Sequence, residues 1–179
     1  MKTKTLLFIA MILVLGCCSD DDNKPMAEID KLPPATQHGA NKAGCLVNGK
    51  AFLPKGYITT GNLRCNYING LDFSLIIGER VENQINSVAI ISYNTTLEEG
   101  QTYILTQYQE DSKYGFYSIG SAPPPRVGYY HTTSVITGEF TITRHDFDNA
   151  FLSGTFWFDA VNSEGEIIEV REGRFDVEY

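Results

Sequence analysis

The chain has 179 residues, a formal net charge of −8 and 12% aromatic residues. This length accommodates a short leader and one domain of ordinary size, and so acidic a chain is a poor partner for nucleic acid or for anionic lipid surfaces. Aromatic residues are plentiful and long helix-forming stretches are missing, so the composition favours strands over helices.

The first residues have the features of an export signal. A basic start with Lys2 and Lys4 precedes an apolar run, Leu6–Leu15. Ten residues span about 15 Å as a helix, half of the roughly 30 Å core of a bilayer. The run therefore predicts a signal peptide and not a membrane-spanning helix.

Cys17 is the expected site of lipid attachment. The small residue Gly16 followed by Cys17 resembles a lipobox, although Leu15 is bulkier than the usual residue at its position. The resemblance implies cleavage before Cys17, with residues 1–16 as the signal peptide. Cys18 is the poorer acceptor because Cys17 would then occupy the position of the small residue. Loss of the two leader lysines gives the mature chain a charge of −10.

An acidic cluster, Ser19, Asp20, Asp21 and Asp22, follows the lipobox. It resembles the export signal that sends Bacteroidota lipoproteins to the outer face of the outer membrane. The alternative is a solvated linker that only avoids burial. Residues 17–42 are polar and rich in turn residues, without an apolar period, and predict a flexible linker with a reach of roughly 25–30 Å.

Residues 43–179 predict a single all-β domain. Asn48-Gly49 and Asn69-Gly70 each separate two apolar runs, and Asn-Gly pairs favour tight hairpins because both positions adopt positive φ. No segment has a sustained helical period. We expect an antiparallel β-sandwich or a partly closed barrel of about eight to ten strands, with little helix outside the signal peptide.

The C-terminal third repeats the pattern Gly-x-Phe-x-apolar. Period-2 alternation places each glycine, phenylalanine and final apolar residue on one face. The pattern predicts three consecutive antiparallel strands with a shared aromatic layer, in which the glycines relieve crowding beside a neighbouring ring or mark bulges. The three segments are Gly138–Ile142, Gly154–Phe158 and Gly173–Val177.

Two cysteines fall inside the domain. Cys45 and Cys65 are 20 residues apart, without the spacing of a metal or redox motif. In an oxidising compartment they could form a disulfide, which would contribute roughly 3 kcal/mol by the chain-entropy model. The alternative is two free buried thiols that pack as small apolar residues, and the sequence leaves both open.

No catalytic or cofactor motif stands out in the sequence. There are three histidines and no GxSxG, HExxH, paired CxxC or EF-hand loop, so we expect no catalytic residues and no cofactor. His145, Asp146 and Asp148 are weak candidates for a metal site on a strand connection. A polar turn, with Asp and Asn bonding their own backbone, is the preferred interpretation.

Aromatic side chains are the remaining candidates for ligand contacts. Trp157 lies opposite the phenylalanine layer, and Tyr117, Tyr129 and Tyr130 flank a proline run. Exposed tyrosine and tryptophan offer an apolar face with a polar group, which suits sugars and protein interfaces. The alternative is that Trp157 packs in a second core layer while the tyrosines line the rims of the sheet.

Both ends of the domain resemble a group of small Bacteroidota lipoproteins of unknown function. The resemblance implies the compartment and the fold class, and it carries over no activity and no functional residues. It covers Leu32–Gln37, Gly44–Gly49, Ser153–Phe156, Ala160–Gly165 and Gly173–Asp176.

From these features we expect a lipid-anchored protein of the outer membrane, exposed at the cell surface, with a domain that faces the periplasm as the alternative. Its expected role is that of a non-enzymatic module that binds a glycan or a partner protein. A structural envelope lipoprotein without a ligand is the alternative, and a hydrolase ranks third. The expected partners are the membrane, through the lipid, and a glycan or protein, but no nucleic acid.

Overall fold

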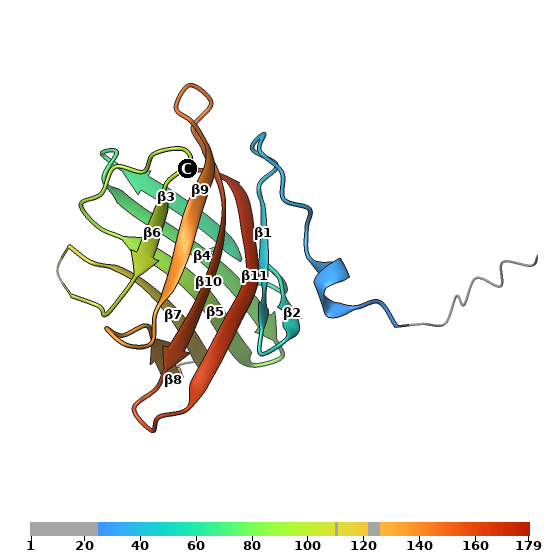
Figure 1. Ribbon diagram of the computed structural model, residues 1–179. Coiled ribbons are helices and arrows are strands. Elements are labelled where there is room, and N and C mark those ends of the chain that lie inside the picture. Colours follow the sequence, from blue (N-terminus) through green and yellow to red (C-terminus); the bar gives the residue numbers. More distant parts are fainter. Residues whose placement is uncertain (1–24, 110, 122–125) are drawn as a thin grey trace, which may run out of the picture.

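The computed structural model describes residues 25–109, 111–121 and 126–179, and eleven strands and one short 3₁₀ helix lie within these residues (Figure 1). The strands are β1 (Lys42–Val47), β2 (Lys50–Phe52), β3 (Leu63–Ile68), β4 (Asp72–Val81), β5 (Gln84–Ser92), β6 (Thr102–Leu105), β7 (Lys113–Ser121), β8 (Arg126–His131), β9 (Gly138–Asp146), β10 (Phe151–Val161) and β11 (Ile167–Glu178). The ladders between them are antiparallel, so the all-β prediction is confirmed.

All strands belong to one curled sheet, which makes a partly closed barrel and not a sandwich of two sheets. The main path runs β2-β1-β11-β10-β8-β7-β5-β4-β3, while β9 branches from β10 and carries β6. In Figure 1, β9, β10 and β11 pass in front of β4, β5 and β7. Within the described residues no ladder joins the edge strands β2 and β3. Lys55, which follows β2 in the chain, bonds to β4 near these edge strands. Its N–H donates to the carbonyl of Gly78, and its carbonyl accepts from the N–H of Arg80.

The strand count exceeds the expected eight to ten because β8 was not predicted. This strand follows the proline run and carries Gly128 at its centre, so it shows no clear alternation, although Val127, Tyr129 and Tyr130 are residues that favour strands. Its backbone pairs along β7, with Tyr130 opposite Tyr117. Tertiary pairing therefore supplies the strand that the local pattern does not indicate.

Both predicted Asn-Gly hairpins are confirmed. Asn48 and Gly49 have φ of 47° and 74°, and Asn69 and Gly70 have φ of 55° and 70°. These positive values match the type I′ turn that follows the right-handed twist of the strands. The turns fix the registers of β1 with β2 and of β3 with β4.

The three Gly-x-Phe segments form β9, β10 and β11 side by side, as predicted. Their shared face points into the barrel, where Phe140, Phe156, Phe158 and Phe175 are at most 3% exposed. Each glycine lies where a Cβ would collide with a neighbouring strand or ring. The same alternation turns the intervening polar residues and Trp157 outward.

Inside the barrel, side chains from almost every strand form one apolar core. Phe73 of β4 stacks on Phe140 of β9, with ring centroids 5.8 Å apart, which ties the back of the barrel to the front. The interior is a packed core, which leaves the outer wall as the surface open to ligands.

Part of the expected flexible linker packs against the barrel. The short helix Glu28–Lys31 contacts β2, because the N–H of Ala51 donates to the Glu28 carboxylate, and Leu32 is buried. The Asp176 carboxylate accepts from the N–H groups of residues 38–40 and from the hydroxyl of Thr36. Residues 25–41 are called the strap below. The predicted flexible linker over 17–42 is thus wrong for the strap, and residues 17–24 lie outside the described part of the chain.

Candidate functional site

A concave groove lies on the outer face of β9, β10 and β11, where the alternation of these strands turns polar side chains outward. Its volume is about 320 Å³, and Ala35 of the strap contributes to one wall. The strand residues that line it are Glu139, Thr141, Thr155, Phe156, Trp157, Arg171, Glu172, Gly173 and Arg174. We call it the Trp157 groove.

Trp157, the single tryptophan of the chain, is 39% exposed in this groove. The guanidinium carbon of Arg171 lies 5.5 Å from the centroid of its ring, within the range of a cation–π contact. Arg171 is held in turn by Asp159 at 2.7 Å and by Glu169 at 3.7 Å, and it donates to the carbonyl of Val170. The ring is therefore positioned by its neighbours while part of its surface remains open to solvent.

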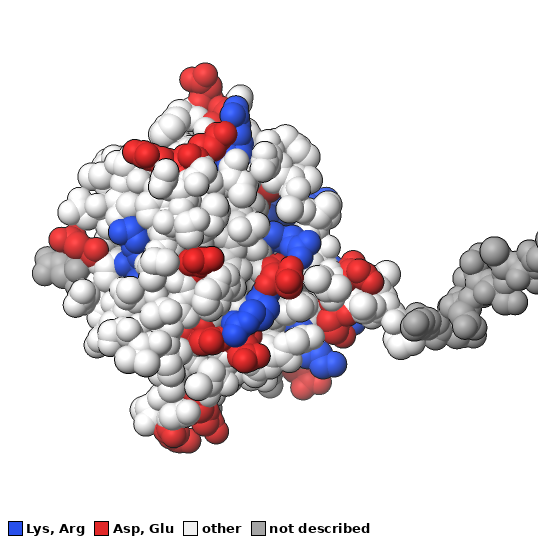
Figure 2. Space-filling view, viewed as in Figure 1, with Lys and Arg blue, Asp and Glu red and all other residues white. Residues whose placement is uncertain are grey.

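Polar groups surround the tryptophan. Arg174 pairs with Glu172 at 3.4 Å, and the hydroxyls of Thr141 and Thr102 are 2.7 Å apart. Figure 2 shows acidic and basic side chains alternating over this face. An aromatic platform with donors and acceptors beside it can stack against the apolar face of a sugar ring while bonding its hydroxyls.

The four predicted ligand-contact aromatics do not come together. Tyr117 and Tyr130 face the barrel interior, each 7% exposed, with ring centroids 6.0 Å apart. They are core residues, and their proposed role in ligand contact is corrected. Burial raises the pKa of Tyr117 to about 12, in keeping with its core position. Trp157 and Tyr129 lie on the outer wall, on different strands.

The outer wall also carries a row of aromatic rings, of which only Tyr129 was predicted from the sequence as a ligand contact. Tyr129 stacks on His131 with centroids 5.8 Å apart, and His131 lies 6.1 Å from Phe116. The row is called the aromatic strip and consists of Tyr93, Tyr108, Tyr114, Phe116, His131 and Tyr129. The i, i+2 spacing of 114 with 116, and of 129 with 131, was the signal that could have found it.

The weak metal candidates form a polar turn beside a structural histidine. His145 is 7% exposed, and its Nδ1 and Nε2 lie within hydrogen-bond distance of the Leu97 carbonyl and the Tyr179 hydroxyl. Asp146 accepts from the backbone of Asn149, which lowers the pKa of this carboxyl. Asp148 is exposed. Among the described residues, no group of three or more His, Cys, Asp or Glu side chains is arranged to hold a metal ion.

Cys45 and Cys65 have free thiols in this structure, so the two residues are not joined by a disulfide in it. Cys45 lies in β1 and points into the core, whereas Cys65 lies in β3 at the far end of the strand order. Burial raises the pKa of both thiols, that of Cys65 to about 12, so neither is a ready nucleophile.

The anchor residues predicted from the sequence, Cys17 and Ser19 to Asp22, lie outside the described residues. In the part of the chain that the structure describes, no helix is long and apolar enough to cross a membrane.

One protein family matches this chain. The model of DUF6252, a domain of unknown function, matches residues 76–177, which is more than half of the sequence and includes the strands that carry the groove and the strip. No curated protein matches the chain, and no solved structure does. The extent of the family match shows that the chain belongs to the DUF6252 family.

Proposed function

We propose that this protein is a lipid-anchored, non-enzymatic binding module of the cell envelope, and that it binds a saccharide in the Trp157 groove. The observation that carries the proposal is the exposed tryptophan in a concave, polar groove. Packing explains the aromatic residues inside the barrel, but Trp157 lies outside the core with 39% of its surface open.

The surroundings of Trp157 favour a sugar over an apolar ligand. The groove combines one aromatic ring with hydroxyl, carboxylate and guanidinium groups, and Arg171 and Arg174 are both held by carboxylates. Such paired groups can exchange hydrogen bonds with a ligand that has many hydroxyls without leaving a buried charge unpaired. An aliphatic ligand would remove water from these polar groups without forming hydrogen bonds to them.

In this proposal, lipid on Cys17 and the export signal Ser19 to Asp22 direct the module to the outer membrane, where it is exposed at the cell surface. Because the strap packs against the barrel, only the residues before it connect the barrel to Cys17. Seven residues, 18–24, separate Cys17 from Pro25, where the described chain begins, and the eight steps between these two residues span at most about 29 Å at full extension. The barrel would thus stay near the membrane. Its acyl chains would hold it there, since each methylene buried in the bilayer contributes about 0.8 kcal/mol of binding free energy.

The test is binding of the full chain, in detergent micelles, to an array of neutral and acidic oligosaccharides. We expect at least one class to bind, with Trp157→Ala lowering affinity about tenfold or more and Trp157→Phe losing less because a ring remains. Tyr57→Ala is the matched control, since Tyr57 is an aromatic residue in a loop with 73% exposure.

Thermal unfolding of each variant separates a binding role from a structural one. Because Trp157 faces outward, its truncation should leave the melting temperature close to that of the wild type. A folded Trp157→Ala protein that binds every saccharide as the wild type does would contradict the proposal. Binding to no saccharide would instead support the structural envelope role.

A further inference from the structure

We propose that the aromatic strip is a second binding surface, independent of the Trp157 groove, and that it binds a neutral polysaccharide chain along β7 and β8. Nothing in the proposed role of the groove requires this surface. The two sites differ in chemistry, because the groove carries charged pairs and the strip consists of rings alone.

The strands fix the outward direction of the rings. Gly115 and Tyr117 of β7 face the core, since a Cβ on Gly115 would meet the Phe158 ring and Tyr117 belongs to the core cluster. Alternation therefore turns Tyr114 and Phe116 to the outer wall. On β8, His131 is paired directly opposite Phe116 and follows it to the same side.

The rings form a continuous row. Successive centroids from Tyr93 through Tyr114, Phe116 and His131 to Tyr129 are separated by 6.4, 6.3, 6.1 and 5.8 Å. A row of evenly spaced rings suits a chain of repeating units, because the exposed rings of Tyr93, Tyr108 and Tyr129 can each stack against a different unit, while Tyr114 is buried among its neighbours. A single small sugar would use only one or two of them.

The strip has a rigid base and open rings. Tyr114 is 8% exposed and lies over the β5 residue Ile91, its direct cross-strand partner, which is itself buried. Tyr108 packs edge-on against Tyr114 at 5.0 Å, yet remains 62% exposed, and Tyr129 remains 42% exposed. The aliphatic surface is thus already covered, and aromatic faces with hydroxyl groups are what a ligand meets.

The strip has no fixed charge, although the whole chain carries −8. Its one ionisable group near neutral pH is His131, and burial lowers the pKa of this imidazole, so the ring is neutral at pH 7. A charged ligand would find no counter-charge among these six residues. The arginine and methionine residues that mark the centres of protein interfaces are also missing from the strip.

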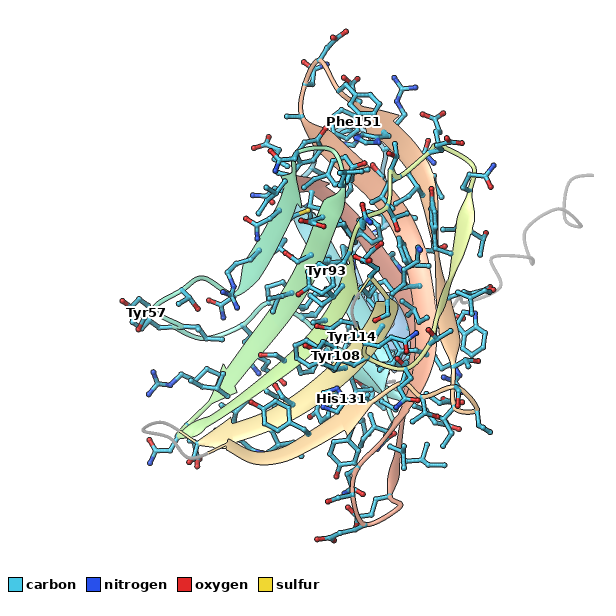
Figure 3. All side chains as sticks on the ribbon, turned by 90° about the vertical axis from the view of Figure 1, so that its left-hand side faces the viewer. Tyr57, Tyr93, Tyr108, Tyr114, His131 and Phe151 are labelled. Carbon is cyan, nitrogen blue, oxygen red and sulfur yellow. The ribbon has the colours of Figure 1, made fainter. Side chains whose placement is uncertain are left out.

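The position of the strip fits an anchored protein. Figure 3 shows Tyr93, Tyr108, Tyr114 and His131 grouped on the side of the barrel that faces left in Figure 1, whereas the strap lies on the right. The strap, which precedes β1 in the chain, therefore lies on the side of the barrel away from the rings. A long polymer can reach the strip without passing the strap.

Affinity electrophoresis of the full chain tests the inference, in gels that contain soluble neutral glucan, xylan or mannan, with an acidic polysaccharide for comparison. We expect at least one neutral polymer to retard the protein. The double variant Tyr108→Ala/Tyr129→Ala should reduce the affinity about tenfold or more, while Tyr57→Ala should retain it. Oligosaccharides of increasing length should bind more tightly until the row of rings is filled.

A second measurement does not depend on variants. In aromatic NMR spectra of the wild type, the neutral polymer should shift tyrosine and His131 resonances and leave those of Trp157 unchanged. The inference is overturned if no neutral polymer binds, if the double variant binds as the wild type does, or if only the acidic polymer binds. A concentration-dependent dimer that the double variant abolishes would also overturn it and would identify a protein interface. Loss of neutral-polymer binding in Trp157→Ala, with the double variant binding as the wild type does, would place the polymer in the groove and would also overturn the inference.

Discussion

Gly154 and Gly173 each lie against the phenylalanine of the neighbouring strand. Gly154 of β10 pairs with Phe175 of β11, and Gly173 of β11 pairs with Phe156 of β10. A Cβ on Gly173 would come within 2.5 Å of the Phe156 ring. The glycines of the repeated pattern therefore make room for the rings and are not turn residues.

The substitution Gly173→Ala should destabilise the protein by about 1–3 kcal/mol, because the added methyl group must displace Phe156 in a packed core. Gly128→Ala is the control. Its Cβ would meet only the Tyr130 ring at 3.6 Å, so we expect a change within about 0.5 kcal/mol. Urea unfolding of the two variants checks this, and equal stability of both would contradict the packing role of Gly173.

Single residues also show where the sequence was insufficient. Alternation predicted that Trp157 lies opposite the phenylalanine layer, and it does. The same rule could not separate Tyr129 from Tyr130, because their strand was not predicted and its register was unknown. Adjacent residues in a strand face opposite sides, so a register ambiguity of one residue exchanges a core tyrosine for a surface one.

Among the elements, the strap departs most from the sequence-based prediction. Its composition is that of a linker, and its bonds to Asp176 join residues about 140 positions apart in the chain. Asp176 was assigned by alternation to the outer face of its strand, and it is on that face, but the strap covers it and leaves it 2% exposed. No local pattern indicates such a contact, since it depends on where the folded barrel places the carboxylate.

The strap makes a prediction about acid stability. Burial alone would raise the pKa of Asp176, but hydrogen bonds from Thr36, Ala40, Ser153 and His38 outweigh it and hold the pKa well below its usual range. A carboxyl with a lowered folded-state pKa stabilises the protein above its unfolded value of about 3.9. This contribution is lost as the pH falls from there toward the folded-state pKa.

The variant Asp176→Asn should therefore lose roughly 2–3 kcal/mol at pH 7, because an amide places donors where the strap also offers donors. Its stability should fall less steeply than that of the wild type below about pH 4. Asp148→Asn, at an exposed turn, is the control. Hydrogen exchange should show faster exchange at residues 38–40 in Asp176→Asn only, and unchanged exchange there would refute the role of the carboxylate.

At the scale of the whole molecule, the class of fold was predictable and its closure was not. Hairpin turns, alternation and composition are local signals, and they indicated an antiparallel all-β domain. Whether such strands make two sheets or one curled sheet depends on long-range pairing, such as that of β1 with β11. The concave Trp157 groove also depends on the strap, which the sequence assigned to a linker.

The proposed anchor predicts the behaviour of the chain in its cell. Metabolic labelling with a fatty-acid analogue should label the wild type and Cys18→Ala, and Cys17→Ala should lose both the label and its place in the membrane fraction, since lipid is its proposed membrane anchor. Label retained in Cys17→Ala and lost in Cys18→Ala would move the anchor to Cys18. Label in neither the wild type nor Cys18→Ala would contradict lipid attachment to this protein.

The most direct test of a saccharide in the groove uses the tryptophan as its own reporter. Because the chain has one tryptophan, its fluorescence reports on the groove alone. Titration with the saccharides whose affinity Trp157→Ala lowers should give a saturable change in the intensity or wavelength of Trp157 emission, with the midpoint at the dissociation constant. Saturated binding with unchanged Trp157 emission would show that the ligand sits elsewhere and would contradict the account.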